Sequence, residues 1–154
     1  MKLVLGYNGS DSSKKALALV QKYAKEFNAE VHILTSLISE QVEQRVRAPI
    51  SLATTNDLKQ LRKNYGEESD IAKEAESQLE SAQKILANEG ISCETHLFIQ
   101  GLEPGEDIVD FAKKIGADFI VVGIGRTSRV GKMFFGSNAQ YVILEASCPV
   151  ITVK

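Results

Sequence analysis

Short apolar runs rich in β-branched residues alternate along this chain with longer stripes of apolar residues at helical spacing. The runs occupy Lys2–Tyr7, Val31–Ser36, His96–Ile99, Phe119–Gly123 and Val150–Val153. In three of them, at Leu3–Leu5, Ile120–Val122 and Val150–Val153, the residues do not alternate between apolar and polar. Strands that are apolar on both faces are typical of a parallel sheet covered by helices. The chain is therefore expected to fold around a parallel sheet.

Four stripes with i, i+3 and i+4 spacing separate these runs, as expected for helices that pack one face on a core. They cover Ser12–Phe27, Ile71–Leu86, Ile108–Ile115 and Ala139–Ala146. Asp11 or Ser12 is expected to cap the first helix, and Gly90 and Gly116 to end the second and third. The alternation predicts an α/β fold, a three-layer open sandwich of the Rossmann-like kind. Its five-stranded parallel sheet would carry helices on both faces.

The length, net charge and cysteine content of the chain limit its number of domains and the partners it can have. A chain of 154 residues suits one ordinary domain, so residues 1–154 are expected to form a single domain. The net charge of −2 argues against a nucleic-acid partner. The apolar run Leu3–Leu5 is too short for an export signal or a membrane span, which favours a soluble, cytoplasmic protein. Cys93 and Cys148 cannot form a disulfide framework and are expected to be small core residues.

A basic, glycine-rich segment, Gly123–Ser137, follows the fourth apolar run. It carries Arg126, Arg129 and Lys132 and contains no acidic residue. Glycines let a ligand approach the backbone closely, and the helix that begins near Ser137 directs free N–H groups and the positive end of its dipole toward the segment. The segment therefore predicts a phosphate-binding loop.

Two familiar phosphate motifs match this segment only in part. The dinucleotide fingerprint begins at Gly123-Ile124-Gly125, but Ser128 stands where its third glycine belongs. Gly131-Lys132 is similar to part of a P-loop, but Met133 replaces the required Ser or Thr. A plain surface loop, with glycines in turns and solvated basic side chains, remains the alternative.

The exit of the first run, Gly6–Ser12, supplies a second group of candidates. In a doubly wound sheet this loop lies beside the loop that leaves the fourth strand, across the switch point. Its short polar side chains could reach a ribose or a metal-bound phosphate. The alternative is turn chemistry at Asn8-Gly9, with Ser and Asp residues serving as helix caps. The polar stretch Leu37–Gly66 shows no motif and could be a lid, a partner surface or a mobile insertion.

Three stretches resemble the universal stress protein family, and together they span nearly the whole chain. Leu3–Leu17 resembles the family's first strand, loop and helix, in which Gly-Ser follows the strand. Gly101–Gly123 resembles its proline-containing turn, amphipathic helix and Gly-Ala-Asp before an apolar strand. Gly136-Ser137, followed by Cys148-Pro149-Val150, resembles the family's C-terminal signature. The resemblance implies the same α/β sandwich.

The resemblance also implies a site for ATP or another adenine nucleotide, with or without Mg²⁺. The family's ATP-binding members use Gly-x-x-Gly, nine residues and then Gly-Ser. Arg126 replaces the second glycine of that pattern and could either pair with phosphate or occupy its space. Asn8 replaces the family's aspartate, and the backbone of Ser36 would face the adenine. The implied ligand-binding residues are Gly6, Tyr7, Asn8, Ser36, Val122, Gly123, Gly125, Arg126, Gly136, Ser137 and Asn138.

Members of the family often dimerise through the last strand, which here is Val150, Ile151, Thr152 and Val153. Pairing with a second copy would cover an apolar sheet edge. The expected protein is thus a homodimeric nucleotide-binding module in stress response or signalling, with weak ATP hydrolysis at most, no catalytic residue and an unidentified protein partner. A dimeric interaction module without nucleotide remains open, as does an ATP-pyrophosphatase-type enzyme suggested by Gly9–Ser12.

His32 and His96 both fall in expected strands, where a buried imidazole with satisfied hydrogen bonds is the expected role. Neither has a cysteine or carboxylate at metal-ligand spacing in the sequence, so no metal site is expected.

Overall fold

The computed structural model describes residues 1–37, 70–98, 103–125 and 136–154. Within these ranges the chain forms a five-stranded parallel sheet with the strand order β3-β2-β1-β4-β5. The strands are β1 (Lys2–Gly6), β2 (Glu30–Ser36), β3 (Cys93–Phe98), β4 (Phe119–Gly123) and β5 (Val150–Val153). The order reverses between β1 and β4, so these two neighbours flank the switch point of a doubly wound sheet.

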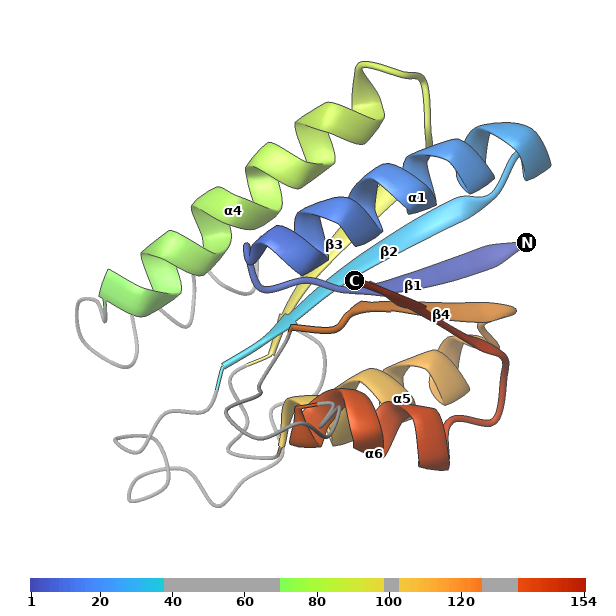
Figure 1. Ribbon diagram of the computed structural model, residues 1–154. Coiled ribbons are helices and arrows are strands. Elements are labelled where there is room, and N and C mark those ends of the chain that lie inside the picture. Colours follow the sequence, from blue (N-terminus) through green and yellow to red (C-terminus); the bar gives the residue numbers. More distant parts are fainter. Residues whose placement is uncertain (38–69, 99–102, 126–135) are drawn as a thin grey trace.

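Helices cover both faces of the sheet (Figure 1). On one face lie α1 (Asp11–Phe27) and α4 (Asp70–Ala87), and on the other lie α5 (Pro104–Ile115) and α6 (Ser137–Glu145). The expected three-layer α/β sandwich with a five-stranded parallel sheet is confirmed. In the described part of the chain, no helix is both long and apolar enough to cross a bilayer.

Alternate side chains of the central strands feed two separate cores. Leu3 and Leu5 of β1 face α1 and α4, whereas Val4 between them faces α5 and α6. All three are at most 2% exposed. Because both faces of β1 are buried, its uninterrupted apolar run is explained by helices on either side. The free thiols of Cys93 and Cys148 are half-buried at the margins of the two cores.

Two local details of α1 differ from the sequence expectations. Ser10, rather than Asp11 or Ser12, caps α1: its Oγ accepts a hydrogen bond from Ser13 N at 3.3 Å. Ser10 takes this role because its backbone is extended directly before the first helical residue. Phe27, the last residue of α1, is 57% exposed and does not continue the buried stripe.

Strand β3 begins at Cys93, three residues before the expected start at His96. Pairing with β2 explains the longer strand, since Cys93 lies opposite Val31 in the register. The first residues of β3 mix polar and apolar types because this strand lies at the edge of the sheet, where burial is incomplete.

Candidate functional site

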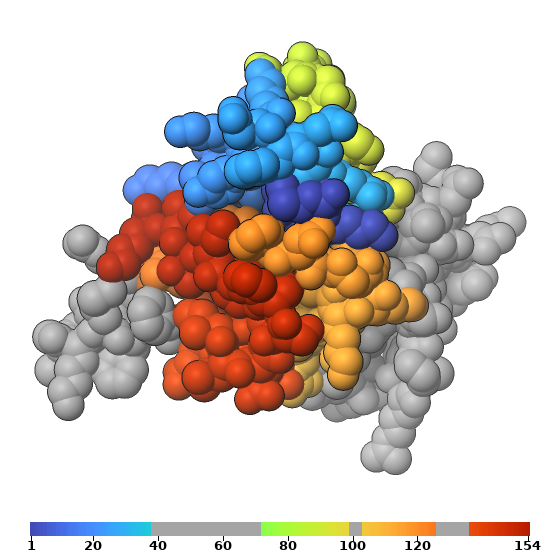
Figure 2. Space-filling model, turned by 90° about the vertical axis from the view of Figure 1, so that its right-hand side faces the viewer, coloured from blue at the N-terminus to red at the C-terminus, as the bar shows by residue number. Residues whose placement is uncertain are grey.

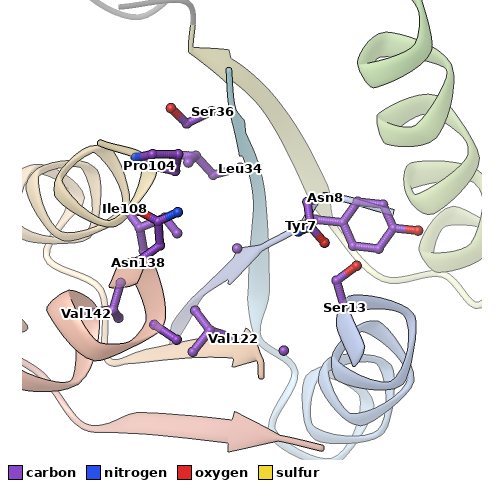
Figure 3. Close-up of a pocket in the computed structure, with 13 residues that line it drawn as sticks. Tyr7, Asn8, Ser13, Leu34, Ser36, Pro104, Ile108, Val122, Asn138 and Val142 are labelled. Carbon is purple, nitrogen blue, oxygen red and sulfur yellow. The ribbon is translucent and has the colours of Figure 1, made fainter. Parts of the chain in front are cut away.

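A pocket opens where β1 and β4 end, with α5 and α6 on one side and the start of α1 on the other (Figure 3). Its cavity volume is about 100 Å³. The lining comes from strand ends, the loop after β1 and the first turns of helices: Gly6, Tyr7, Asn8, Ser13, Leu34, Ser36, Pro104, Ile108, Val122, Gly123, Asn138, Ala139 and Val142. This is the edge at which open parallel sheets bind their ligands.

Many of the residues singled out in the sequence surround this pocket. The lining includes Gly6, Tyr7, Asn8, Ser36, Val122, Gly123 and Asn138. Gly125 is exposed beyond the end of β4, and Gly136 and Ser137 lie at the start of α6, next to the lining residue Asn138. Arg126, Arg129 and Lys132 lie outside the described residues, as does nearly all of the stretch 37–66.

Three helices begin at the pocket. Ser13 belongs to the first turn of α1, Pro104 is the first residue of α5, and Asn138 and Ala139 are in the first turn of α6. Of these three helix starts, only that of α6 has no acidic residue in its first turn, and its N-cap residue, Gly136, makes no side-chain cap hydrogen bond. Its N–H groups and positive dipole end are therefore available to an anion.

Asn8 presents a hydrogen-bond donor to the pocket. Its Oδ1 accepts from Ser10 Oγ at 2.7 Å and from Ser10 N at 3.2 Å. This local ring fixes the amide and holds the residue that caps α1. The side-chain oxygen is thereby engaged, and the Nδ2 group is the part of the amide left for a ligand.

Tyr7 lines the pocket through its backbone. The residue is 7% exposed, its ring belongs to the core under α1 and α4, and Figure 3 shows the ring pointing away from Ile108 and Asn138. Burial raises the pKa of the phenol. The carbonyl oxygen accepts from Thr35 Oγ1 at 2.7 Å, and the N–H donates to the carbonyl oxygen of Leu34 at 2.8 Å. These bonds fix the loop that carries Asn8.

Two glycines at the strand ends are set by close packing. A Cβ on Gly123 would lie 2.4 Å from the carbonyl carbon of Ser12 and 2.5 Å from Ser13 N, so the first turn of α1 rests directly on this residue. A Cβ on Gly6 would lie 2.8 Å from Cδ1 of Ile108, inside the lining of the pocket. Gly123 is thus required by helix packing whether or not a ligand is bound.

The starts of α5 and α6 are joined through Asn138. Its Oδ1 accepts a hydrogen bond from the backbone N–H of Gly105 at 3.3 Å. A Cβ on Gly105 would lie 2.8 Å from the carbonyl oxygen of Asn138, so the two helices cross in close contact. Asn138 therefore caps a neighbouring helix as well as lining the pocket.

Ser36, at the end of β2, donates a hydrogen bond from Oγ to Oδ2 of Asp107 in α5. Asp107 is 3% exposed. Its pKa is raised mainly because burial removes water from the charged carboxylate; the Ser36 bond opposes that shift, and Asp110 and Glu106 add to it. The hydrogen bond to Asp107 therefore fixes the side chain of Ser36 beside the pocket.

Sequence reasoning did not identify several lining residues. These are Ser13, Leu34, Pro104, Ile108, Ala139 and Val142. Leu34, Ile108 and Val142 belong to the apolar patterns that were assigned to the core, and the core on that face does contain them. Proximity of Ser13 and Pro104 to the strand ends could have been inferred from their positions at helix starts, which a parallel sheet brings to one edge.

The structure corrects the expectation that the buried histidines have all their hydrogen bonds satisfied. Glu94 Oε2 lies 3.6 Å from His32 Nδ1 and 3.8 Å from His96 Nε2, so one carboxylate lies close to both rings. His32 Nε2 is buried and makes no hydrogen bond to a described residue, so this imidazole is not fully satisfied. The sequence concealed the cluster because it depends on the register between β2 and β3, which pairs His32 with Glu94.

The fold and the pocket define the class: a doubly wound α/β protein whose ligand pocket lies at the switch point and is bordered by helix starts. The model of the universal stress protein family matches residues 1–154. YxiE, a universal stress protein of Bacillus subtilis, is 31% identical over 153 residues, which cover 99% of this chain and 98% of the relative.

Solved structures of universal stress proteins are also similar to this chain. The universal stress protein of Archaeoglobus fulgidus has a TM-score of 0.72 and 31% identity, covering 100% of this chain and 98% of the other. The structure of the universal stress protein from that organism in complex with dAMP has a TM-score of 0.66 and 30% identity, with the same coverage. The chain belongs to the universal stress protein family, which confirms the resemblance seen in the sequence.

Proposed function

We propose that this chain is a homodimeric, cytoplasmic nucleotide-binding module that takes ATP or another adenine nucleotide in the switch-point pocket, with little or no turnover. Its role would lie in stress response or signalling. One site per chain, in a single domain of residues 1–154, is the expected stoichiometry. The observation that carries the proposal is the open start of α6 beside the pocket, where an anion gains N–H donors from a first turn that has no acidic residue of its own.

The polar groups of the pocket suit a nucleotide. Phosphate would lie against the first turn of α6, near Gly136 and Ser137, and Nδ2 of Asn8 would donate to a ribose or phosphate oxygen. A volume of about 100 Å³ accommodates one moiety, because complete small-molecule sites measure roughly 300–1,000 Å³. Adenine or ribose would occupy it, with adenine beside Ser36. Support also comes from the relative that was solved with dAMP.

The lining favours binding over turnover. Among the described lining residues, Tyr7 is the only one with a titratable side chain, and its ring points away from the cavity. Hydrolysis of a nucleotide needs a positioned water and a group that orients it or accepts its proton. Asp107 is buried beneath the pocket and bonded to Ser36. Mg²⁺ would arrive with the phosphates, since the oxygen of Asn8 is already engaged by Ser10.

The dimer would form through β5. Within the described residues β5 pairs only with β4, which leaves its outer edge open. The preceding helix, α6, exposes Leu144 (68%) and Ile143 (39%), and Figure 2 shows the red segment from α6 to β5 as one area of the surface. Edge-to-edge pairing of two copies would satisfy the open strand and bring these apolar groups near a partner.

Calorimetric titration of the purified chain with ATP–Mg²⁺ and with AMP tests the proposal, followed by chromatography of the nucleotide after incubation. Saturable binding at one site per chain with intact ATP is expected. Absence of binding at millimolar nucleotide would favour the dimeric interaction module without a ligand. Rapid release of AMP and pyrophosphate would instead indicate ATP-pyrophosphatase chemistry.

A further inference from the structure

Three potential metal ligands meet on the sheet face that α5 covers. His32 of β2 lies opposite Glu94 of β3, and His96 follows on the same face of β3. His32 Nδ1 is 3.1 Å from His96 Nε2, and Glu94 Oε2 is 3.6 Å and 3.8 Å from these two nitrogens. None of the three residues lines the switch-point pocket. The cluster is therefore a separate feature of the fold.

The spacing of these atoms matches a metal centre. A point equidistant from three atoms separated by 3.1, 3.6 and 3.8 Å lies about 2.0 Å from each of them. Zinc binds imidazole nitrogen at about 2.0–2.1 Å and carboxylate oxygen at about 2.0–2.2 Å. The three donors could thus reach one ion with little movement, and a water molecule would complete the coordination on the solvent side.

The second ring nitrogen of His32 supports this role. Nε2 is buried, makes no hydrogen bond to a described residue and lies 3.5 Å from Oε1 of Glu30. A histidine that binds metal through one nitrogen usually directs the N–H of the other toward a carboxylate, which fixes the tautomer and orients the ring. Glu30 stands where that second carboxylate is needed.

Phe111 packs against both imidazole rings, and the exposed side of the cluster at Glu94 leaves a path by which an ion can enter. The rings of His96 and Phe111 of α5 have centroids 4.4 Å apart, and the ring of His32 lies 5.7 Å from the same phenyl group. The side chains of His32 and His96 are only 6% and 12% exposed, whereas that of Glu94 is 62% exposed. An ion could enter past Glu94 without any opening of the core.

The protonation state of the two imidazoles also suits metal binding. Burial, reinforced by His32, lowers the pKa of His96 to about 4, and burial lowers the pKa of His32 despite the nearby Glu30 and Glu94 carboxylates. Both shifts favour the neutral imidazole, which is the form that binds metal.

We propose that His32, Glu94 and His96 form a binding site for one divalent transition-metal ion of the zinc type. Two imidazoles and one carboxylate favour Zn²⁺, Co²⁺, Ni²⁺ or Cu²⁺ over Mg²⁺ and Ca²⁺, which prefer oxygen ligands. The ion joins the edge strand β3 to β2 and so stabilises the open side of the sheet. The alternative is a hydrogen-bonded pair of neutral imidazoles that binds no ion.

Tag-free protein, stripped of metal with a chelator, is titrated with ZnCl2 in a calorimeter, and its thermal midpoint is recorded with and without Zn²⁺. Co²⁺ supplies a second readout through its visible absorption, which reports a site of low coordination number. The expected results are one Zn²⁺ per chain at this site, a rise in thermal midpoint on binding and a Co²⁺ spectrum that Zn²⁺ displaces.

Single substitutions test whether the ion binds at the proposed ligands. Glu94→Gln changes an exposed residue and keeps its size, so the fold should persist while zinc affinity falls at least about tenfold. His96→Gln should do the same. Glu80→Gln, an exposed change on α4, is the matched control and should bind as the wild type does. Cys93→Ser should also leave binding intact, because Cys93 packs against the core on the opposite face of the sheet.

Zinc binding that is equal in the wild type, Glu94→Gln and His96→Gln would overturn the proposal, since the ion would then lie elsewhere. Absence of stoichiometric binding at micromolar protein would also overturn it, and would leave the hydrogen-bonded imidazole pair. Nuclear magnetic resonance of the imidazole nitrogens checks the same point without mutation: Zn²⁺ must shift one nitrogen of each histidine.

Discussion

Gly123 at the end of β4 lies so close to the start of α1 that a Cβ on it would be 2.4 Å from the carbonyl carbon of Ser12. The same residue lines the switch-point pocket, so packing of the helix and access of a ligand depend on one missing side chain. At Gly125 and Gly136, by contrast, an added Cβ meets no atom of the described residues within 4 Å. Gly123, Gly125 and Gly136 are therefore glycines for different physical reasons, and substitutions can distinguish helix packing from ligand access.

Replacing Gly123 should affect folding stability first. Gly123→Ala would force the backbone of α1 away from β4, and overpacking of this kind costs about 2–3 kcal/mol in the free energy of unfolding. Gly125→Ala, two residues further on, should leave stability nearly unchanged. Urea denaturation followed by circular dichroism measures both; equal stability of the two variants would mean that α1 can shift freely.

Replacing Gly136 should affect the ligand and spare the fold. Its backbone has negative φ, and an added Cβ would contact none of the described residues, so Gly136→Leu should be tolerated by the ligand-free protein. A bulky side chain at the uncapped start of α6 would occupy the space proposed for phosphate, and nucleotide affinity should fall about tenfold, equivalent to about 1.4 kcal/mol. Gly136→Ala is the control with a small side chain. Unchanged affinity in Gly136→Leu, measured by calorimetry, would remove phosphate from this helix start.

Asn8→Asp should strengthen binding of nucleotide with Mg²⁺. The carboxylate would accept the same two bonds from Ser10, so the loop should keep its shape. The substitution replaces the Nδ2 donor with a second carboxylate oxygen, which can bind Mg²⁺ or accept a hydrogen bond from a ribose hydroxyl. A charged hydrogen bond exceeds a neutral one by about 1 kcal/mol, which corresponds to about fivefold in affinity.

The gain should disappear without Mg²⁺, because a bare carboxylate repels phosphate. Titrations of both proteins with ATP in the presence of Mg²⁺ and of excess chelator make the comparison. Tighter binding of metal-free ATP to Asn8→Asp would contradict placement of phosphate near this side chain.

The central strands could be predicted because both of their faces are buried. β1 and β4 are continuous apolar runs, and no polar residue interrupts the three buried positions of either strand. The start of β3 could not be predicted in the same way, since Cys93, Glu94 and Thr95 lie at the sheet edge and carry no clear pattern. Edge strands lose the signal of burial on which such predictions depend.

The polar contacts were harder to foresee because they join distant parts of the sequence. Ser36 and Asp107 are 71 residues apart, and His32 and His96 are 64 apart. The first contact requires the packing of α5 on β2, and the second requires the register between β2 and β3; composition and spacing contain neither. The polar character of the loop after β1 could be predicted from the sequence because its hydrogen bonds are local, between Asn8 and Ser10.

Asp107 should make stability depend on pH in an identifiable window. Burial raises its pKa above the usual 3.8, so the folded protein holds the proton more tightly than the unfolded chain does. The contribution of this group to stability is therefore complete below pH 3.8 and is lost as pH rises through the raised folded-state pKa.

Asp107→Asn keeps an oxygen that accepts from Ser36 and cannot titrate. The free energy of unfolding of this variant relative to the wild type should therefore increase as pH rises through that window. Glu26→Gln, an exposed change on α1, is the control and should give a flat difference. Urea denaturation at a series of pH values measures the difference, and a flat curve for Asp107→Asn would show that the carboxylate is not desolvated.

The outer edge of β5 offers a direct test of the proposed dimer. The carbonyl oxygen of Pro149, just before β5, accepts from Ile120 N of β4, and that of Val153 accepts from Ile124 N, just after β4. Alternate residues along this edge therefore turn their backbone groups toward β4. Thr152 lies between these inward positions, and its N–H points away from β4, toward any partner strand. Thr152→Pro removes that donor without removing a bond to β4, and proline is tolerated on edge strands. The variant should sediment as a folded monomer, whereas Thr152→Val, which keeps the N–H, should sediment as a dimer like the wild type. A dimer that survives Thr152→Pro at equal concentration would exclude strand pairing through β5.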